Sequence, residues 1–146
     1  MQFDHIGVVV EEIAEGRSFL ESAFGITRWT EVFDDPGIGV YVQFGMGSNG
    51  PCYELIAPRE EKSPISVALR TGKAILNHVA YLVPDLDAAA EKLCNEGAMP
   101  VSEAQPAVAY EQQRVQFFLS PLRFIVELIE APEHLHKFVS SERVSQ

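Results

Sequence analysis

An internal repeat constrains the fold of this chain more than any other feature of its sequence. The apolar segment at residues 3–10 contains one histidine, and the similar segment at residues 76–83 contains another, 73 positions later. The same offset relates Glu54 to Glu127, each of which is followed by Leu-Ile. One histidine and one glutamate therefore repeat in register with the apolar residues around them, so we expect two halves that fold alike.

Hydrophobic periodicity predicts the order βαβββ in both halves, and hence an α+β fold. In the first half we expect a helix at residues 12–24 and strands at 3–10, 27–33, 40–44 and 52–57. In the second half we expect a helix at residues 85–96 and strands at 76–83, 98–102, 113–119 and 123–129. Neither half can cover both faces of its sheet alone. We therefore predict two modules related by a pseudo-twofold, whose curved mixed sheets enclose a metal-binding cleft with the helices outside.

The length of 146 residues fits one domain of two modules that share a core. We place that domain at residues 1–132: module 1 at about 1–58, a linker at 59–74 and module 2 at about 75–132. Ser63-Pro64 in the linker predicts a short helix at 64–70, capped by the serine. Residues 133–146 are expected to form a peripheral polar tail. Its His134 and His136 could bind a metal, but we expect them to be solvated.

Composition excludes several classes of partner. The net charge of −10 gives no general attraction to nucleic acid or to anionic lipid. No apolar run approaches the ~18 residues of a membrane span, and an expected strand at the N-terminus leaves no room for a signal peptide. Cys52 and Cys94 are expected to be free, buried thiols, which fits the cytoplasm.

We expect a turn at residues 34–37, and we interpret the glycine-rich residues 45–50 as a hairpin rather than a phosphate-binding loop.

Strand alternation predicts where the repeated glutamates point. Side chains alternate between the faces of a strand, and the larger neighbours of Glu54 and Glu127 suit packing under a helix, so both glutamates should face the concave side. Such residues are costly to bury unless they are paired or bound to a metal. With His5 and His78 they form a set of two imidazoles and two carboxylates, which suits one divalent ion of Zn, Ni, Co, Mn or Fe. The alternative is that the histidines are core residues and the glutamates form salt bridges.

Several segments also resemble one known family. Residues 3–10 (FDHIGVVV) resemble the opening strand of the vicinal oxygen chelate superfamily, and residues 53–58 (YELIAP) resemble its fourth strand. That superfamily includes glyoxalase I, methylmalonyl-CoA epimerase, extradiol dioxygenases and fosfomycin-resistance proteins. Further segments are similar to the epimerase branch, at residues 63–65, 71–78, 106–108, 114–119 and 127–130.

The resemblance implies a metal-dependent isomerase or epimerase that stabilises an enolate or enediolate of a carbonyl substrate. Glu127 or Glu54 would be the catalytic base, with Asp35 as an alternative. Two departures from the epimerases are visible. Glu54 stands where they often have glutamine and where bacterial glyoxalase I has glutamate, and Asp35 is the acid nearest to their catalytic glutamate before the third strand.

The substrate class and some alternatives stay open. An acyl-CoA would need cations for its phosphates, and a set of basic residues lies near the expected cleft: Arg59, Lys62, Arg70 and Lys73, with Arg114 and Arg123 as weaker candidates. They could equally be ordinary solvated charges. A glyoxalase I-type lactoylglutathione lyase is the second candidate function. An extradiol dioxygenase, a non-enzymatic small-molecule-binding member and a structural module are further alternatives. We expect a homodimer.

Overall fold

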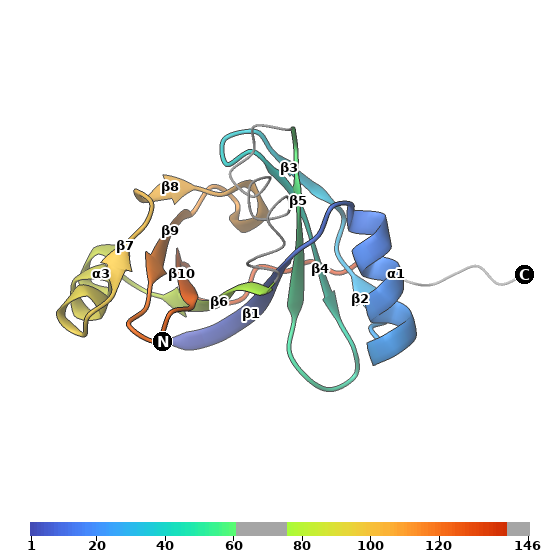
Figure 1. Ribbon diagram of the computed structural model, residues 1–146, viewed down its shortest axis with the longest axis horizontal. Helices are drawn as coiled ribbons and strands as arrows, with labels where there is room; N and C mark the ends of the chain where they lie inside the picture. Colours follow the sequence, from blue (N-terminus) through green and yellow to red (C-terminus); the bar gives the residue numbers. More distant parts are fainter. Residues whose placement is uncertain (61–75, 140–146) are drawn as a thin grey trace, which may run out of the picture.

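A single mixed sheet of ten strands dominates the computed structural model, which describes residues 1–60 and 76–139 (Figure 1). The first half contains β1 (Gln2–Val9), α1 (Ile13–Phe24), β2 (Arg28–Trp29), β3 (Phe33–Asp35), β4 (Val40–Met46) and β5 (Tyr53–Pro58). The second half contains β6 (Leu76–Val83), α3 (Leu86–Asn95), β7 (Met99–Pro100), β8 (Gln105–Pro106), the 3-10 helix η1 (Val108–Tyr110), β9 (Arg114–Leu119) and β10 (Ile125–Glu130).

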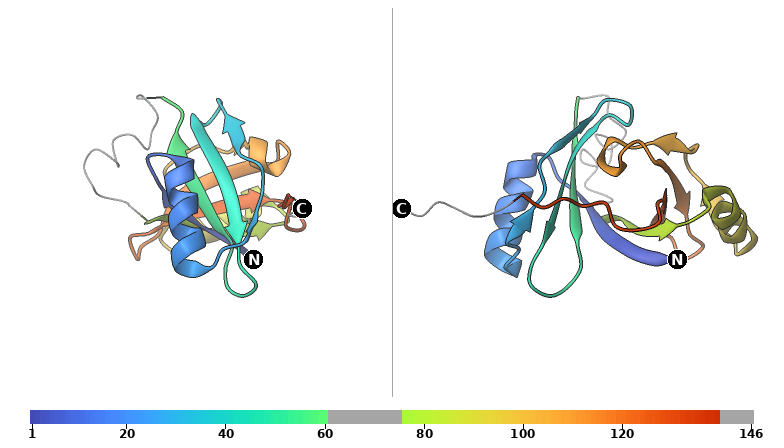
Figure 2. Two further views of the ribbon diagram at one scale, coloured as in Figure 1. Left: turned by 90° about the vertical axis from the view of Figure 1, so that its right-hand side faces the viewer. Right: turned by 180° about the vertical axis from the view of Figure 1, so that it is seen from behind.

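The two halves of the sheet have the same pairing pattern. The strand order is β2-β4-β5-β1-β6-β10-β9-β7, with β3 paired to β4 and β8 to β9. β1 and β6 pair antiparallel at the centre. Each also pairs in parallel with the last strand of its own half, β5 or β10. The sheet is strongly bent, and α1 and α3 lie on its outer sides (Figures 1 and 2). The curved mixed sheet predicted from the sequence is confirmed.

Two apolar clusters explain why the helices lie outside the sheet. Leu55 of β5 packs with Leu20 and Trp29 in the cluster beneath α1. Leu128 of β10 occupies the equivalent place beneath α3, with Leu86 and others. Because side chains alternate along a strand, the residue before each leucine points to the opposite face. Those residues are the repeated glutamates, so the alternation that buries the leucines also directs both carboxylates inward.

Local capping supports the start of α3 but not that of α1, where Glu12 makes no side-chain cap hydrogen bond. Asp85 caps α3, because its side chain accepts a hydrogen bond from the backbone N–H of Ala88 at 3.1 Å.

None of the helices in the described part of the chain is long and apolar enough to cross a membrane. The helix expected at residues 64–70 lies outside the described residues. The loop at 45–50 joins the antiparallel strands β4 and β5, as the hairpin interpretation predicted.

The strand predicted at residues 27–33 is wrong, because the structure divides it into β2 and β3. Thr30 lies between them: its N–H donates to the Phe44 carbonyl oxygen at 3.0 Å, and it also forms an isolated bridge with Phe138. Its hydroxyl accepts a hydrogen bond from the Phe44 N–H at 3.1 Å, and its carbonyl oxygen accepts one from the Gln43 amide at 2.7 Å. The predicted turn at 34–37 also begins too early, since Asp35 still belongs to β3.

Two predictions in the second half also need correction. The strand expected at 98–102 is limited to the two residues of β7, and the two-residue β8 was not predicted. Cys94 is exposed on α3 and not buried. Its neighbour Leu93 packs against the core beneath the helix, which turns Cys94 towards solvent. Cys52 is free and buried as predicted, and burial raises the pKa of its thiol to about 12.

Candidate metal centre

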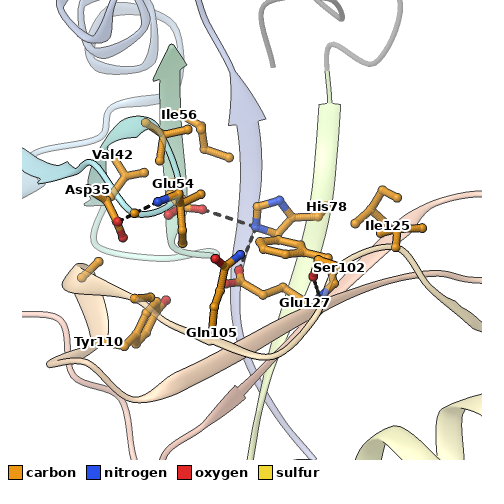
Figure 3. Close-up of a pocket in the computed structure, with 17 residues that line it drawn as sticks. Asp35, Val42, Glu54, Ile56, His78, Ser102, Gln105, Tyr110, Ile125 and Glu127 are labelled. Atoms are coloured by element: carbon orange, nitrogen blue, oxygen red, sulfur yellow. Dashed lines mark hydrogen bonds and ion pairs between the residues drawn. The ribbon is translucent and has the colours of Figure 1, made fainter. Parts of the chain in front are cut away.

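The four residues of the sequence repeat meet at one point of the concave face. His5 lies on β1, His78 on β6, Glu54 on β5 and Glu127 on β10. All four are buried, and their ligand atoms lie within 4.8 Å of one another. The two histidine Nε2 atoms are 3.0 Å apart. Figure 3 shows the carboxylates of Glu54 and Glu127 directed at the imidazole of His78.

The spacing of the ligand atoms matches the edges of a metal coordination shell. His5 Nε2 lies 3.1 Å from Glu54 Oε1 and 3.2 Å from Glu127 Oε1. His78 Nε2 lies 3.3 Å and 3.0 Å from the same two oxygens. With bonds of ~2.0–2.2 Å, neighbouring ligand atoms lie ~3 Å apart around an octahedral ion and ~3.4 Å apart around a tetrahedral ion. These residues could therefore hold one divalent ion without a change of backbone.

A carboxylate oxygen at the centre of the cluster supports the same fit. Glu127 Oε1 is buried and forms no hydrogen bond with good geometry in the described part of the chain, although both imidazoles are close to it. A buried carboxylate oxygen left in this way is costly. A cation at the centre would satisfy it. The donor set and this oxygen together fit a divalent metal better than a set of plain ion pairs.

Electrostatic coupling between the four residues is strong. Burial alone would raise the pKa of Glu54, but the neighbouring charge of His5 and hydrogen bonds from His5 and His78 lower it to about 2. Burial alone would lower the pKa of His5, and the charge of Glu54 and the carboxylates around it raise it well above its ordinary value. The pKa of His78 is likewise raised by Glu127 and Glu54 against the effect of burial. A metal cation in the cluster would replace these shared protons.

Each histidine stands across the β1–β6 pair from a very small residue. His78 is opposite Gly7, and His5 is opposite Ala80, the residue that follows Gly7 by one repeat. A Cβ placed on Gly7 would lie 2.2–2.6 Å from three ring atoms of His78. Opposed residues of an antiparallel pair share one face of the sheet. The absence of a side chain at Gly7 therefore provides the space in which the His78 ring reaches the cluster.

Asp4 and Tyr110, which were not predicted from the sequence, hold His5. Its Nδ1 lies 2.8 Å from Asp4 Oδ2 and 2.9 Å from the Tyr110 hydroxyl, which also donates to Asp4 Oδ2 at 2.6 Å. Neighbours in a regular strand point to opposite faces, but the β1–β6 register shifts between Phe3 and His5. This bulge allows Asp4 to reach the imidazole beside it. Its position directly before His5 was the only signal in the sequence.

The prediction of a solvated histidine tail is wrong for His136, whereas His134 has a 44% exposed side chain and also contacts Asp4. His134 Nδ1 lies 2.6 Å from Asp4 Oδ1, and His136 Nε2 lies 2.9 Å from Asp4 Oδ2. The side chain of His136 is only 5% exposed and packs on Phe44, with ring centroids 4.2 Å apart. The tail therefore reaches the back of the candidate centre.

A cavity of about 510 Å³ opens over the cluster. Glu54, His78 and Glu127 lie on its wall, together with Asp35 (Figure 3). The rest of the lining is mostly apolar, from residues such as Val40, Val42, Ile38, Ile56, Ala107, Phe117 and Ile125. Gln105 and Ser102 add polar groups that the sequence analysis did not identify. Small-molecule sites combine an apolar wall with a few directed polar groups in this way.

Asp35 is fixed at the wall of this cavity. Its Oδ1 accepts a hydrogen bond from the Ile38 N–H at 3.0 Å, and its Oδ2 accepts one from the Val108 N–H at 3.0 Å. Both bonds are from the backbone, so the carboxylate is oriented and its remaining lone pairs can accept a further proton or donor. The structure thus brings the third predicted catalytic residue to the same cavity as Glu54 and Glu127.

The described basic residues are not placed to bind an anionic substrate in the cavity. Arg59 pairs with Asp34 at 2.6 Å on the surface. Arg114 pairs with Glu130 at 3.0 Å, and hydrogen bonds from Arg114 and Leu86 lower the pKa of that carboxyl. Lys62, Arg70 and Lys73 lie outside the described residues. No lysine or arginine lines the cavity in residues 1–60 or 76–139.

Comparisons with known proteins agree with the fold. A family model described as "Glyoxalase/Bleomycin resistance protein/Dioxygenase superfamily" matches residues 4–117. A comparison with curated protein sequences gives no significant match. A hypothetical protein from Bacillus halodurans is 22% identical, with a TM-score of 0.77 over 93% of this chain and 98% of that one.

Two further solved structures are methylmalonyl-CoA epimerases. The enzyme from Mycobacterium tuberculosis is 23% identical, with a TM-score of 0.73 over 90% of this chain and 89% of that one. A variant of the Streptomyces coelicolor enzyme in complex with 2-nitronate-propionyl-CoA is 22% identical, with a TM-score of 0.65 over 88% of this chain and 96% of that one. At these identities the likeness establishes a shared fold.

Proposed function

Because the chain belongs to the glyoxalase/bleomycin resistance protein/dioxygenase superfamily, we propose that it is a metal-dependent isomerase that moves a proton next to a substrate carbonyl group. The observation that carries this proposal is the meeting of His5, His78, Glu54 and Glu127 at the wall of an apolar cavity. The proposed ligands are these four residues, with one divalent ion of Zn, Ni, Co, Mn or Fe.

The metal, when bound, would act as a Lewis acid that stabilises the negative charge developing on substrate oxygen. The residues of the chain would supply the rest of the reaction. A carboxylate oxygen of Glu127 or Glu54 accepts the proton from the carbon beside the carbonyl. Asp35, held by two backbone N–H groups, is the alternative base. The apolar wall excludes water, so the charged groups interact in a medium of low dielectric constant.

The repeat places the two glutamates on different halves of the sheet, and this arrangement favours epimerisation. Glu54 extends from β5 and Glu127 from β10, so they approach the cavity from opposite sides. If one takes the proton from one face of the carbon, the other can return a proton to the opposite face. We therefore propose an epimerase of the methylmalonyl-CoA type, a reaction that the names of two structural neighbours also contain.

A glyoxalase I-type lactoylglutathione lyase is the second candidate. Glu54 favours it, because the set of two histidines and two glutamates resembles that of bacterial glyoxalase I. The cavity also lacks a cation for CoA phosphates among the described lining residues. In that reaction the proton returns to the neighbouring carbon. A homodimer and a cytoplasmic location stay predictions from the sequence.

Solvent exchange tests the proposed proton transfer. The protein is stripped with a chelator, reloaded with Co²⁺, Ni²⁺, Zn²⁺, Mn²⁺ or Fe²⁺, and incubated in D₂O with methylmalonyl-CoA. We expect deuterium at the α-carbon at least ~100-fold faster than with the stripped protein, since positioned acid–base groups contribute ~10²–10⁴-fold. Mass spectrometry of the recovered thioester measures the exchange.

The hemithioacetal of methylglyoxal and glutathione provides the matched comparison. Lactoylglutathione formation without α-exchange of methylmalonyl-CoA would favour the lyase over the epimerase. If the protein bound metal but turned over neither substrate, both named activities would be wrong. Binding of small carbonyl compounds without any metal uptake would identify it as a non-enzymatic binding member.

A further inference from the structure

The segment that follows β10 crosses the molecule and returns to the first half. It runs from the end of β10, behind the central strands, to β2 beside α1 (Figures 1 and 2). Phe138 bridges Thr30, and the Val139 N–H donates to the Trp29 carbonyl oxygen at 2.8 Å. The guanidinium of Arg28 lies 5.0 Å over the ring of Phe138. Residues 133–139, which we call the C-terminal strap, are therefore attached at their far end.

The strap delivers two histidines to a carboxylate that is fully buried. The side chain of Asp4 is 0% exposed. It contacts four hydrogen-bonding groups, from His5, Tyr110, His134 and His136, at 2.6–2.9 Å. His5, Tyr110 and His136 contact Oδ2, and His134 contacts Oδ1, so both oxygens of the buried carboxylate have partners. Two of the four come from the strap.

The contact with Asp4 has a direct consequence for His5. Asp4 lies at Nδ1 of the imidazole, so the nitrogen left to bind a metal is Nε2, which is the atom that faces Glu54 and Glu127. A carboxylate behind a metal-binding histidine fixes both the tautomer and the ring orientation. The ring of His136 packs at a tilt on Phe44, which also contacts His5 edge-on, so the strap packs against the same wall.

The sequence repeat places different residues directly before the two histidines. The residue before His78 is Asn77, an amide, whereas the residue before His5 is Asp4. An amide cannot carry the negative charge that makes hydrogen bonds from four donors favourable. At this position of the repeat, the sequence therefore places a carboxylate beside His5, and the strap histidines contact that carboxylate.

We propose that the C-terminal strap is part of the metal centre, with His134 and His136 as positioning residues that act through Asp4 to hold His5 Nε2 towards the cluster. This inference rests on the proposed function, because it assumes that His5 is a metal ligand. It assigns no chemistry to the strap. Its effect is on metal affinity, since a mobile or wrongly protonated imidazole must be reordered before it can bind.

Metal affinity is the measurement that tests the strap. Zn²⁺ and Co²⁺ dissociation constants are obtained by competition with a chromogenic chelator for the parent, His134→Ala, His136→Ala and the double variant. We expect losses of ~10–100-fold, the usual effect of removing a group behind a metal ligand. Lys137→Ala is the matched control, because this strap residue has an 83% exposed side chain that pairs with exposed Glu111. Its affinity should equal that of the parent.

Conservative variants distinguish positioning from general loss of structure. Gln at 136 keeps a donor near the place of Nε2, and Asn at 134 keeps one near the place of Nδ1. We expect His136→Gln and His134→Asn to recover most of the lost affinity.

The outcomes separate this inference from the proposed function. If the parent takes up no metal, the proposed function is wrong, and the inference is wrong with it. If the parent binds metal and the alanine variants bind it within twofold of the parent, the strap inference alone is overturned. Loss of a second equivalent of metal in His134→Ala would also overturn it, because the strap histidines would then be ligands of another ion.

Discussion

Replacing Gly7 with alanine should abolish metal binding at the candidate centre while the sheet remains folded. The added methyl group would lie 2.2–2.6 Å from the Cε1, Nδ1 and Nε2 atoms of His78, far inside van der Waals contact. The methyl group is attached directly to the backbone of a central strand and cannot move aside. The imidazole must therefore rotate out of the cluster. We expect the affinity for Zn²⁺ or Co²⁺ to fall by ~100-fold or more. Overpacking should lower the free energy of unfolding by ~1–3 kcal/mol.

Gly45→Ala is the matched control for this change. A Cβ there would lie 2.5–2.8 Å from the ring of Trp29, in the apolar cluster beneath α1 and away from the four ligands. The loss of stability should be similar, and metal affinity should be unchanged. Calorimetry or chemical denaturation gives the first quantity and chelator competition the second. Equal metal affinity in Gly7→Ala and the parent would show that His78 does not bind the metal.

Glu127→Gln should reduce turnover ~10²–10⁴-fold at saturating metal. The amide has nearly the size and shape of the carboxylate but cannot accept the substrate proton. It also removes a negative charge from the cluster, so metal content must be measured in the same sample. Glu130→Gln is the control on the same strand, because Glu130 pairs with Arg114 and does not line the cavity. It should keep parental turnover.

The companion variant Glu54→Gln separates the two proposed bases. In an epimerase that uses one base on each face, either substitution stops epimerisation. The remaining glutamate can still exchange the proton of the isomer that it faces. We expect the two variants to exchange solvent deuterium into opposite epimers. Unchanged turnover of Glu127→Gln with metal bound would exclude Glu127 as the base and move the test to Asp35.

The parts of the site that could be predicted from the sequence are those that strand alternation determines. Glu54 and Glu127 repeat within apolar strands, so their shared face followed from a period of two residues, and the repeat itself identified His5 and His78 as their companions. The packing of Leu55 and Leu128 beneath the helices has the same origin. The repeat also determined the order of the main strands, since each half has one pattern of pairing.

The parts that could not be predicted depend on irregular backbone or on distant contacts. Asp4 reaches His5 only because of a bulge, which leaves no mark in the hydrophobic pattern. His136 meets Asp4 across 132 positions of sequence, and a polar segment near the C-terminus looks like any solvated tail. The break between β2 and β3 arises from hydrogen bonds of Thr30 with Gln43 and Phe44, a tertiary effect that local propensity does not contain.

Elemental analysis of the purified protein beside a His5→Ala, His78→Ala double variant tests the central claim most directly. Both proteins are dialysed against the same buffer with and without added Zn²⁺, Ni²⁺, Co²⁺, Mn²⁺ or Fe²⁺, and their circular dichroism is compared to establish that both are folded. We predict close to one metal ion per chain in the parent and almost none in the variant. A parent that contains no metal and takes none up would contradict the account, as would a folded variant that binds as much metal as the parent.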